Sequence, residues 1–499
     1  MKLILAGHNI DKEILNEWRR FLDNVRLYLD TETNKDVPKP TRTELEKLCG
    51  DLRRANNTTP ETLSAAYARI SRDPRPVDLL RAESRQWVSK ARRSNRRIVF
   101  GMGHASVAEH AVFNIDIIGI SRYVTEFIQS HRLCSFTEKS QRYVKLDKDF
   151  IIPLEIKNAG FSGEFSGYVK RCFETYLKII HILEHTYRKP AEETGEDARY
   201  VLPLNVTTQM GMTLNARNLE YLLQNAASSG IAELREFGNG LFQVIEGIAP
   251  SLIKHTSGTP ILKFLYKNLQ RTNPIKNSAT EIPPAVKLLY ATPDADDIVL
   301  SALSARNDST PLQNIIENIQ GQPANEKAKP ITDMLHLLNP WDPVPRELEY
   351  GVFRFEIIIS AAAYGQFKRH RMATMTPSSY DPSLGLCIPP LLSETGTSEL
   401  LLKIAEEADT WHRKLSEIDT MIAPYALLGA HRRRVIVQMN ARELIHLSRL
   451  REDIHAQWDI RTIVSEMILL AKKEMPLCLS LAMGKHRFEN DRVYSTTDS

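Results

Sequence analysis

Two stretches of the chain alternate apolar and polar residues in the same way. Such alternation is typical of a β-strand with one buried face. A helix-forming segment, a polar loop, a long helical region and a second helix follow each stretch. Strands and helices mixed without strict alternation predict an α+β fold. The residues expected to face inward are Phe113, Ile115 and Ile117 in the first stretch, and Phe353, Phe355 and Ile357 in the second.

Short motifs recur after both strands. His131-Arg132 is matched by His370-Arg371, and Asn215-Ala216-Arg217 by Asn440-Ala441-Arg442. The offset is 239 residues from Arg132 to Arg371 and 225 residues from Arg217 to Arg442. Motifs that recur in one order at nearly one spacing indicate an internal duplication. We therefore expect an N-terminal α/β extension (1–60), a first repeat (61–265), a second repeat (285–485) and a flexible tail (486–499).

Polar residues mark several expected helix ends. Thr41 and Glu44 have the spacing of a capping box. Asn215 and Asn440 suit N-caps. If the helix after Asn440 continues far enough, Arg451 lies about three turns along it. His455 and Asp459 would then extend the same polar stripe.

Composition narrows the class of protein. The chain has 499 residues, of which 42% are hydrophobic and 25% charged, as in a soluble globular protein. A net charge of +4 without a basic run favours a small nucleotide phosphate over nucleic acid. The five cysteines form no CxxC pair, which argues against a disulfide framework or a zinc site. Without an apolar run of about 20 residues or a signal-peptide pattern, we predict a cytoplasmic protein.

Cations gather where the first helix of each repeat is expected to end. Arginine offers a planar fork that matches phosphate, and His131-Arg132 or Arg369-His370-Arg371 could hold a pyrophosphate or a flavin edge. The alternative is that these cations only complement the helix C-terminus. Their recurrence in a matched block favours a ligand site.

The loop after His131-Arg132 holds two hydroxyls, a carboxylate and a guanidinium, on Ser135, Ser140, Glu138 and Arg142. These groups suit a phosphate and a sugar hydroxyl, although an ordinary solvated loop has the same composition. No Gly-x-Ser-x-Gly elbow supports a hydrolase. His104, Glu109 and His110 do not have metal-ligand spacing, so no metal is predicted.

Together these residues resemble the RHRxxSxxxxSxR signature of the flavin-dependent thymidylate synthases. The resemblance covers roughly residues 60–480, as two tandem copies of a domain that the family usually encodes once. The other segments that carry it are Gly103-His104-Ala105-Ser106, Glu109-His110, Ala198-Arg199-Tyr200-Val201-Leu202-Pro203, Asn215-Ala216-Arg217, and Leu450-Arg451 with His455-Ala456-Gln457-Trp458-Asp459-Ile460-Arg461.

The resemblance implies an enzyme that methylates dUMP to dTMP. It implies bound FAD, with NADPH and methylenetetrahydrofolate as co-substrates. Family members are homotetramers whose sites lie between subunits. One subunit supplies a Gln-x-x-Arg-His-Arg stretch and a base-activating arginine, and its partner supplies a Glu-x-Ser-x-Arg loop and another arginine.

Compared with this pattern, each repeat has lost what the other keeps. Repeat one keeps Glu138, Ser140, Arg142 and Arg199, but has Phe127, Ser130 and Ala226 at the other positions. Repeat two keeps Gln366, Arg369, His370, Arg371 and Arg451, but has Pro377, Asp381 and Pro424. The resemblance therefore implies one composite dUMP site built from complementary halves, in a homodimer that imitates the tetramer.

The implied roles follow position by position. Arg451 is the expected catalytic residue, because it would stabilise negative charge on the uracil. The dUMP-binding set is Gln366, Arg369, Glu138, Ser140, Arg142, Arg199 and Arg451, and the FAD-binding set is Ser71, His104, Ser106, Glu109, His131, Arg132, Asn215, Arg217, Arg369, His370 and Arg371.

Two other functions remain open. Ser130, Tyr221 and Val344 depart from the family pattern near the flavin, so the acceptor could be another uridine nucleotide that is alkylated at C5. The chain could also be a non-catalytic descendant that binds nucleotides or nucleic acid.

Overall fold

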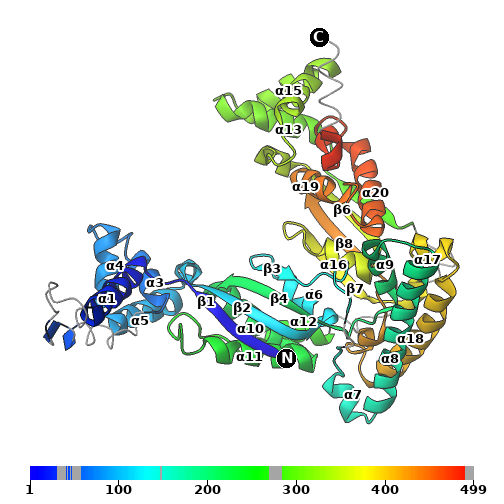
Figure 1. The fold of residues 1–499 in the computed structure, drawn as a ribbon. Coiled ribbons are helices and arrows are strands. Elements are labelled where there is room, and N and C mark those ends of the chain that lie inside the picture. Colours follow the sequence, from blue (N-terminus) through cyan, green and yellow to red (C-terminus); the bar gives the residue numbers. More distant parts are fainter. Residues whose placement is uncertain are drawn as a thin grey trace. The chain divides into compact units, whose positions relative to one another are not determined.

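The computed structural model describes residues 1–30, 41, 43–44, 46–47, 58–146, 149–268 and 284–488. The chain divides into two compact units (Figure 1). Unit 1 comprises Met1–Ile120, Leu133–Lys139 and Thr207–Pro274, and unit 2 comprises Ser121–Arg132, Ser140–Val206 and Ile275–Ser499. Unit 2 therefore combines the second repeat with helices of the first.

Each unit contains a four-stranded sheet, and the two sheets have the same strand order. The order is β1-β2-β4-β3 in unit 1 and β5-β6-β8-β7 in unit 2. The first strand of each sheet pairs antiparallel with the second, and both pairs have an irregularity at the matching place, Leu5/Gly7 and Leu288/Tyr290. The strands are β1 (Lys2–His8), β2 (Val112–Ser121), β3 (Ser135–Glu138), β4 (Thr207–Asn215), β5 (Val286–Ala291), β6 (Val352–Ser360), β7 (Thr374–Tyr380) and β8 (Arg432–Asn440).

Helices cover these sheets. In unit 1, α11 contacts both β1 and α10. The helices of unit 1 are α1 (Lys12–Asp30), α3 (Glu61–Tyr67), α4 (Val77–Gln86), α5 (Val88–Asn95), α10 (Ala216–Ser228), α11 (Ala232–Ile245) and α12 (Pro260–Asn268).

In unit 2, α20 packs on both β5 and β6, and α8 packs on α18 and α9. First-repeat helices therefore lie beside second-repeat helices within one compact unit (Figure 1). The helices of unit 2 are α6 (Arg122–Gln129), α7 (Leu154–Asn158), α8 (Ser162–His181), α9 (Ala191–Ala198), α13 (Ala295–Ser304), α14 (Leu312–Gly321), α15 (Ala324–Leu337), α16 (Ala361–Phe367), α17 (Pro390–Glu394), α18 (Ser398–Ile418), α19 (Ala441–Arg451) and α20 (Trp458–Glu474).

The expected alternation is present in both sheets. All six residues predicted to face inward are buried, on β2 and on β6. The prediction of an α+β fold with a tandem duplication is confirmed. The strand β1 belongs to residues that the sequence placed in an N-terminal extension, yet it pairs with β2 as β5 pairs with β6. The domain boundaries stay a prediction, and residues 489–499 of the expected tail lie outside the described part.

The predicted helix caps form. The side chain of Asn215 accepts a hydrogen bond from the Asn218 amide at 3.0 Å, and that of Asn440 accepts one from the Glu443 amide at 2.9 Å. Thr41 and Glu44 make the reciprocal bonds of a capping box, at 2.8 and 3.3 Å.

The prediction of one helical stripe from Arg451 to Asp459 is wrong, because α19 ends at Arg451. The Asp453 carboxylate accepts a bond from the His455 amide at 3.0 Å, a local turn that competes with helix. The side chain of Gln457 then caps a new helix, α20, by accepting from the Ile460 amide at 3.3 Å. His455 therefore lies in a turn between two helices.

None of the helices within the described residues is both long enough and apolar enough to cross a membrane.

The buried face of the second sheet supplies a stability test. Phe355 on β6 is fully buried, and Phe355→Ala should lower the free energy of unfolding by about 3–5 kcal/mol because it leaves a cavity. The control is Ile436→Ala on the adjacent strand β8, where the side chain is 44% exposed and the expected loss is below about 1 kcal/mol. Denaturant titration of both variants measures the difference. Equal losses would contradict this assignment of the buried face.

Candidate functional site

Four arginines converge in unit 2, and we call Arg142, Arg199, Arg369 and Arg451 the arginine cluster. Arg142 follows the polar loop and Arg199 follows α9, both in the first repeat. Arg369 follows α16 and Arg451 ends α19, both in the second repeat. The Nη2 of Arg142 donates to the backbone oxygen of His455 at 3.3 Å, just beyond Arg451. The structure thus brings together residues that lie more than 300 positions apart in the sequence.

Two guanidinium groups of the cluster, those of Arg451 and Arg199, are partly or fully shielded from water. Burial, together with the smaller effect of the neighbouring charges of Arg369 and Arg142, lowers the pKa of Arg451 to about 10. Burial also lowers the pKa of Arg199, with additional repulsion from Arg122 and Arg142. Charges of one sign disfavour each other in this way, so an anion that binds among them relieves the repulsion.

Arg199 is the most buried member, with 5% of its surface exposed. Its Nε donates to the backbone oxygen of Glu196 at 3.0 Å. Its Nη2 has no hydrogen-bond partner among the described residues. A buried donor without a partner costs about 1–3 kcal/mol, which a ligand oxygen could recover. Arg199 also lines a narrow cavity with Arg122 and Lys368.

A network of hydrogen bonds lies behind the cluster. Arg451 donates through Nε to His370 Nε2 at 3.1 Å and through Nη2 to the Gln366 backbone oxygen at 3.4 Å. The Gln366 side chain donates to Gln457 Oε1 at 3.4 Å, and Gln457 donates to the Tyr200 hydroxyl at 2.7 Å.

The Tyr200 hydroxyl in turn donates to Asp459 Oδ2 at 2.9 Å, and Ser360 donates to the same oxygen at 2.5 Å. These contacts join residues of both repeats within unit 2. They fix the backbone and side chains on which the arginine cluster is built.

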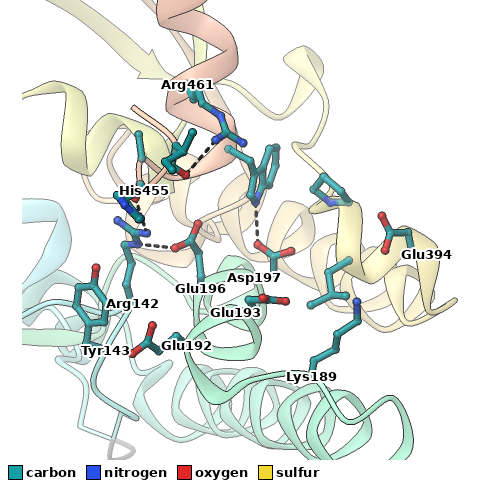
Figure 2. A pocket seen from close by; sticks show the side chains of 15 residues that line it. Arg142, Tyr143, Lys189, Glu192, Glu193, Glu196, Asp197, Glu394, His455 and Arg461 are labelled. Carbon is teal, nitrogen blue, oxygen red and sulfur yellow. Dashed lines mark hydrogen bonds and ion pairs between the residues drawn. The ribbon is translucent and has the colours of Figure 1, made fainter. Parts of the chain in front are cut away.

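A pocket of about 590 Å³ opens beside Arg142 (Figure 2). Figure 2 shows Arg142 held between the Glu196 carboxylate and the His455 backbone. Five carboxyl groups line this pocket, against the cations Arg142, Lys189 and Arg461; they belong to Glu192, Glu193, Glu196, Asp197 and Glu394. Carboxylates in this number repel a polyanion, so a phosphate should bind more favourably at the arginine cluster than in this pocket.

The structure also brings together three of the six positions at which the two repeats depart from the family pattern. Phe127 and Ser130 of repeat one and Pro377 of repeat two line a second pocket of about 320 Å³ in unit 2. Arg433 lies there with its charge already matched, because its Nη1 bonds Glu126 Oε2 at 2.6 Å.

Two tyrosines complete this arrangement. The Arg433 guanidinium lies 4.9 Å from the ring centre of Tyr364 and 4.3 Å from that of Tyr380, and the Tyr380 hydroxyl donates to Glu126 Oε1 at 2.6 Å. Here a buried arginine is neutralised within the protein, unlike Arg451, whose side chain bonds an imidazole and a backbone oxygen.

The two His-Arg motifs meet at the edge of this second pocket. Arg132 donates to the backbone oxygen of Ala373 at 3.4 Å and to Thr374 Oγ1 at 3.2 Å. Arg371 donates to the backbone oxygen of Arg132 at 3.2 Å. Two guanidinium groups on one wall fit a pyrophosphate, and the pocket volume suits part of a dinucleotide. Burial lowers the pKa of His131 and of His370, which favours neutral rings.

The remaining predicted residues belong mainly to unit 1. Glu109 and Arg217 form an ion pair of 2.5 Å, and Asn215 caps the helix that carries Arg217. Ser71, His104 and Ser106 are exposed. Glu138 ends β3 and is buried, with 8% of its surface exposed. In unit 2, Ser140 Oγ accepts from the Arg142 amide at 3.2 Å, which shapes the loop.

Sequence reasoning missed three residues that touch the cluster or its supports. Glu196 pairs with Arg142, and its place three residues before Arg199 on a helical segment was an available signal. Gln457 stands in a motif that carries the family resemblance, but that resemblance predicts no role for it. Glu443, which lies 3.3 Å from His370, had no signal beyond its place in the first turn of a helix.

Comparison with known families places this geometry in context. A family model described as "Thymidylate synthase complementing protein", Thy1, matches the chain twice, at residues 55–251 and 287–477. The chain belongs to the Thy1 family. The two matches agree with the two sheets of equal strand order, and they support an enzyme of the flavin-dependent thymidylate synthase type.

Individual relatives differ in how much of this Thy1 chain they match. UPF0159 protein Ta1429 of Thermoplasma acidophilum is 24% identical, over 81% of this chain and 91% of its own length. A flavin-dependent thymidylate synthase of Clostridium tetani is 32% identical, over 40% of this chain and 82% of its own length. Among solved structures, a UMP/dUMP methylase, PolB, from Streptomyces cacaoi bound with 5-Br dUMP is 16% identical, with a TM-score of 0.32, over 40% of this chain and 95% of its own.

Within the described residues, no group of three or more His, Cys, Asp or Glu side chains is arranged to hold a metal ion.

The acidic pocket generates a pH prediction. Burial raises the pKa of Asp197 to about 6, although Trp458 donates to its Oδ1 at 2.8 Å. The folded state then holds this proton more tightly than the unfolded state, whose carboxyl titrates near 4. Asp197 therefore lowers the free energy of unfolding as the pH rises from about 4 to 6, by roughly 2–3 kcal/mol.

Asp197→Asn keeps an acceptor for Trp458 and removes the titration. Denaturant unfolding of both proteins at several pH values measures the difference between them. The variant should gain stability relative to the parent protein as the pH rises through this window, and parallel curves would refute the assignment.

Proposed function

We propose that this protein methylates dUMP to dTMP, with bound FAD, methylenetetrahydrofolate as carbon donor and NADPH as reductant. The observation that carries the proposal is the arginine cluster, in which burial and mutual repulsion leave a place for an anionic nucleotide. Membership of the Thy1 family supports the reaction type.

We further propose that one dUMP site is built from both repeats. Repeat one would supply Ser140, Arg142 and Arg199 for the phosphate, with Glu138 for a sugar hydroxyl. Repeat two would supply Gln366, Arg369 and Arg451. In unit 2, the side chain of Arg142 from repeat one contacts the backbone of His455 from repeat two. This contact between the repeats supports the proposed division. In this proposal the chain acts as a homodimer.

Arg451 is the proposed catalytic residue. A guanidinium directed at the uracil N3–O2 edge stabilises negative charge there and so activates the ring carbons C5 and C6. The bond to His370 and the bond to the Gln366 backbone hold the Arg451 side chain before substrate arrives. Its place in a partly buried cluster strengthens the interaction, because the local dielectric is low.

Two groups of residues are proposed to contact FAD. The flavin would supply the redox chemistry, and the protein would supply binding and charge. In unit 2 the group is His131, Arg132, Arg369, His370 and Arg371, of which Arg132 and Arg371 suit a pyrophosphate. In unit 1 it is Ser71, His104, Ser106, Glu109, Asn215 and Arg217.

One assay tests the function as a whole. The flavin content of the purified protein is measured, the flavin is reduced with NADPH, and methylenetetrahydrofolate and dUMP are added. Bound FAD, bleaching by NADPH, flavin recovery and dTMP formation are expected. Product from UMP but not dUMP would indicate another uridine nucleotide, and a colourless protein that takes up no FAD would refute the catalytic proposal.

The division between kept and eroded halves gives a mutational prediction. Arg451→Ala should lower kcat/KM for dUMP by about 10²–10³-fold, because one preorganised charge is lost. The control is Asp381→Asn in the eroded half, which keeps the local cap on the Ser383 amide and should leave kcat/KM unchanged. Steady-state dTMP formation measures both variants. Equal damage from the two substitutions would argue against a composite site.

A further inference from the structure

The buried ring of His370 lies between Arg451 and a carboxylate that has no assigned role. On one side, Arg451 Nε donates to His370 Nε2 at 3.1 Å. On the other, Glu443 Oε1 lies 3.3 Å from His370 Nδ1. Both side chains are largely buried, with 2% of the His370 side chain and 9% of the Glu443 side chain exposed. Glu443 lies in the first turn of α19 and Arg451 is its last residue. The His370 ring lies between their side chains.

The hydrogen bond from Arg451 requires one particular form of the ring. Because guanidinium can only donate, His370 Nε2 must present its lone pair, and the proton of the neutral ring then lies on Nδ1. The other tautomer would set an N–H against an N–H and break the contact. A charged ring would do the same and add repulsion, and burial lowers the pKa of His370 away from that form.

We propose that Glu443 is a positioning residue: by accepting a hydrogen bond from His370 Nδ1–H, it selects the tautomer whose Nε2 holds the Arg451 guanidinium. This inference rests on the proposed function of Arg451. The distance between Nδ1 and Oε1 is that of a weak hydrogen bond, but the angle of the contact is not that of a hydrogen bond. Contacts of this kind are often poorly aligned in an empty site and tighten when substrate binds.

The backbone of Glu443 is fixed independently of its carboxylate. Its amide donates to the cap residue Asn440 at 2.9 Å. The carboxylate also lines a small pocket with Arg442 and Arg449, so its charge could act on these two cations instead of on His370. A test must therefore separate the charge of Glu443 from its ability to accept a hydrogen bond.

Two substitutions make this separation. Glu443→Gln removes the charge but keeps an oxygen that can accept from Nδ1–H, and Glu443→Leu removes both. For dUMP methylation we expect Glu443→Leu to lower kcat by about 10- to 100-fold, with a smaller effect on KM, because Arg451 is displaced from the developing charge. Glu443→Gln should stay within about threefold of the parent protein. Loss in both variants, or in neither, would overturn the proposal.

The tautomer can be measured without any turnover. Two-bond ¹⁵N–¹H correlation spectra of histidine-labelled protein distinguish Nδ1–H from Nε2–H, and His370→Asn assigns the signal by its loss. We expect Nδ1–H in the parent protein and in Glu443→Gln. An Nε2–H ring in the parent protein would overturn the inference even if Glu443→Leu does not fold. An absence of dTMP formation by the parent protein would instead refute the proposed function and leave this measurement valid.

Discussion

The concentration of positive charge in unit 2 is the constraint on which the rest of the candidate site depends. Two like charges about 8 Å apart repel by about 2 kcal/mol at an effective dielectric constant near 20. Burial is the main cause of the lowered pKa values of Arg451 and Arg199, and repulsion from neighbouring arginines adds to it. Packing and hydrogen bonds elsewhere must offset this repulsion: the chain of contacts from Gln366 through Gln457 to Tyr200 fixes the helices that carry these arginines. At Arg199, Nη2 is buried without a hydrogen-bond partner among the described residues, so a ligand oxygen could pair with it.

Duplication within one chain explains how such a cluster is assembled. The equal strand order of the two sheets shows that each repeat has the same framework. Unit 2 nevertheless takes α6, α8 and α9 from the first repeat and packs them with helices of the second. A cluster built from two copies of a domain can therefore form inside a single polypeptide. Because both copies are covalently linked, the proposed composite site would let each copy lose the residues that the other supplies.

The sequence predicted local structure well where the determining interactions are local. The alternation at Phe353 and Phe355 and the caps at Asn215 and Asn440 were correct, because burial on a strand and hydrogen bonding at a helix end depend on neighbouring residues. The extension of α19 to Asp459 failed because periodicity alone cannot detect a turn stabilised by Asp453. Contacts such as Glu196 with Arg142 and Glu443 with His370 join segments that are distant in the sequence, and no spacing rule encodes them.

A comparison of Arg433 with Arg451 separates an arginine whose charge is balanced within the protein from one proposed to bind a ligand. Both are largely buried in unit 2 and both lie beside aromatic or imidazole rings. Arg433 faces the Glu126 carboxylate and two tyrosine rings, so its charge is balanced and a phosphate would have to displace an existing ion pair. Arg451 faces a neutral imidazole and a backbone oxygen, which orient it without cancelling its charge. The second pocket, lined by Phe127 and Pro377, thus holds an arginine whose charge Glu126 already balances, whereas the bonds of Arg451 orient its side chain and leave its charge unbalanced.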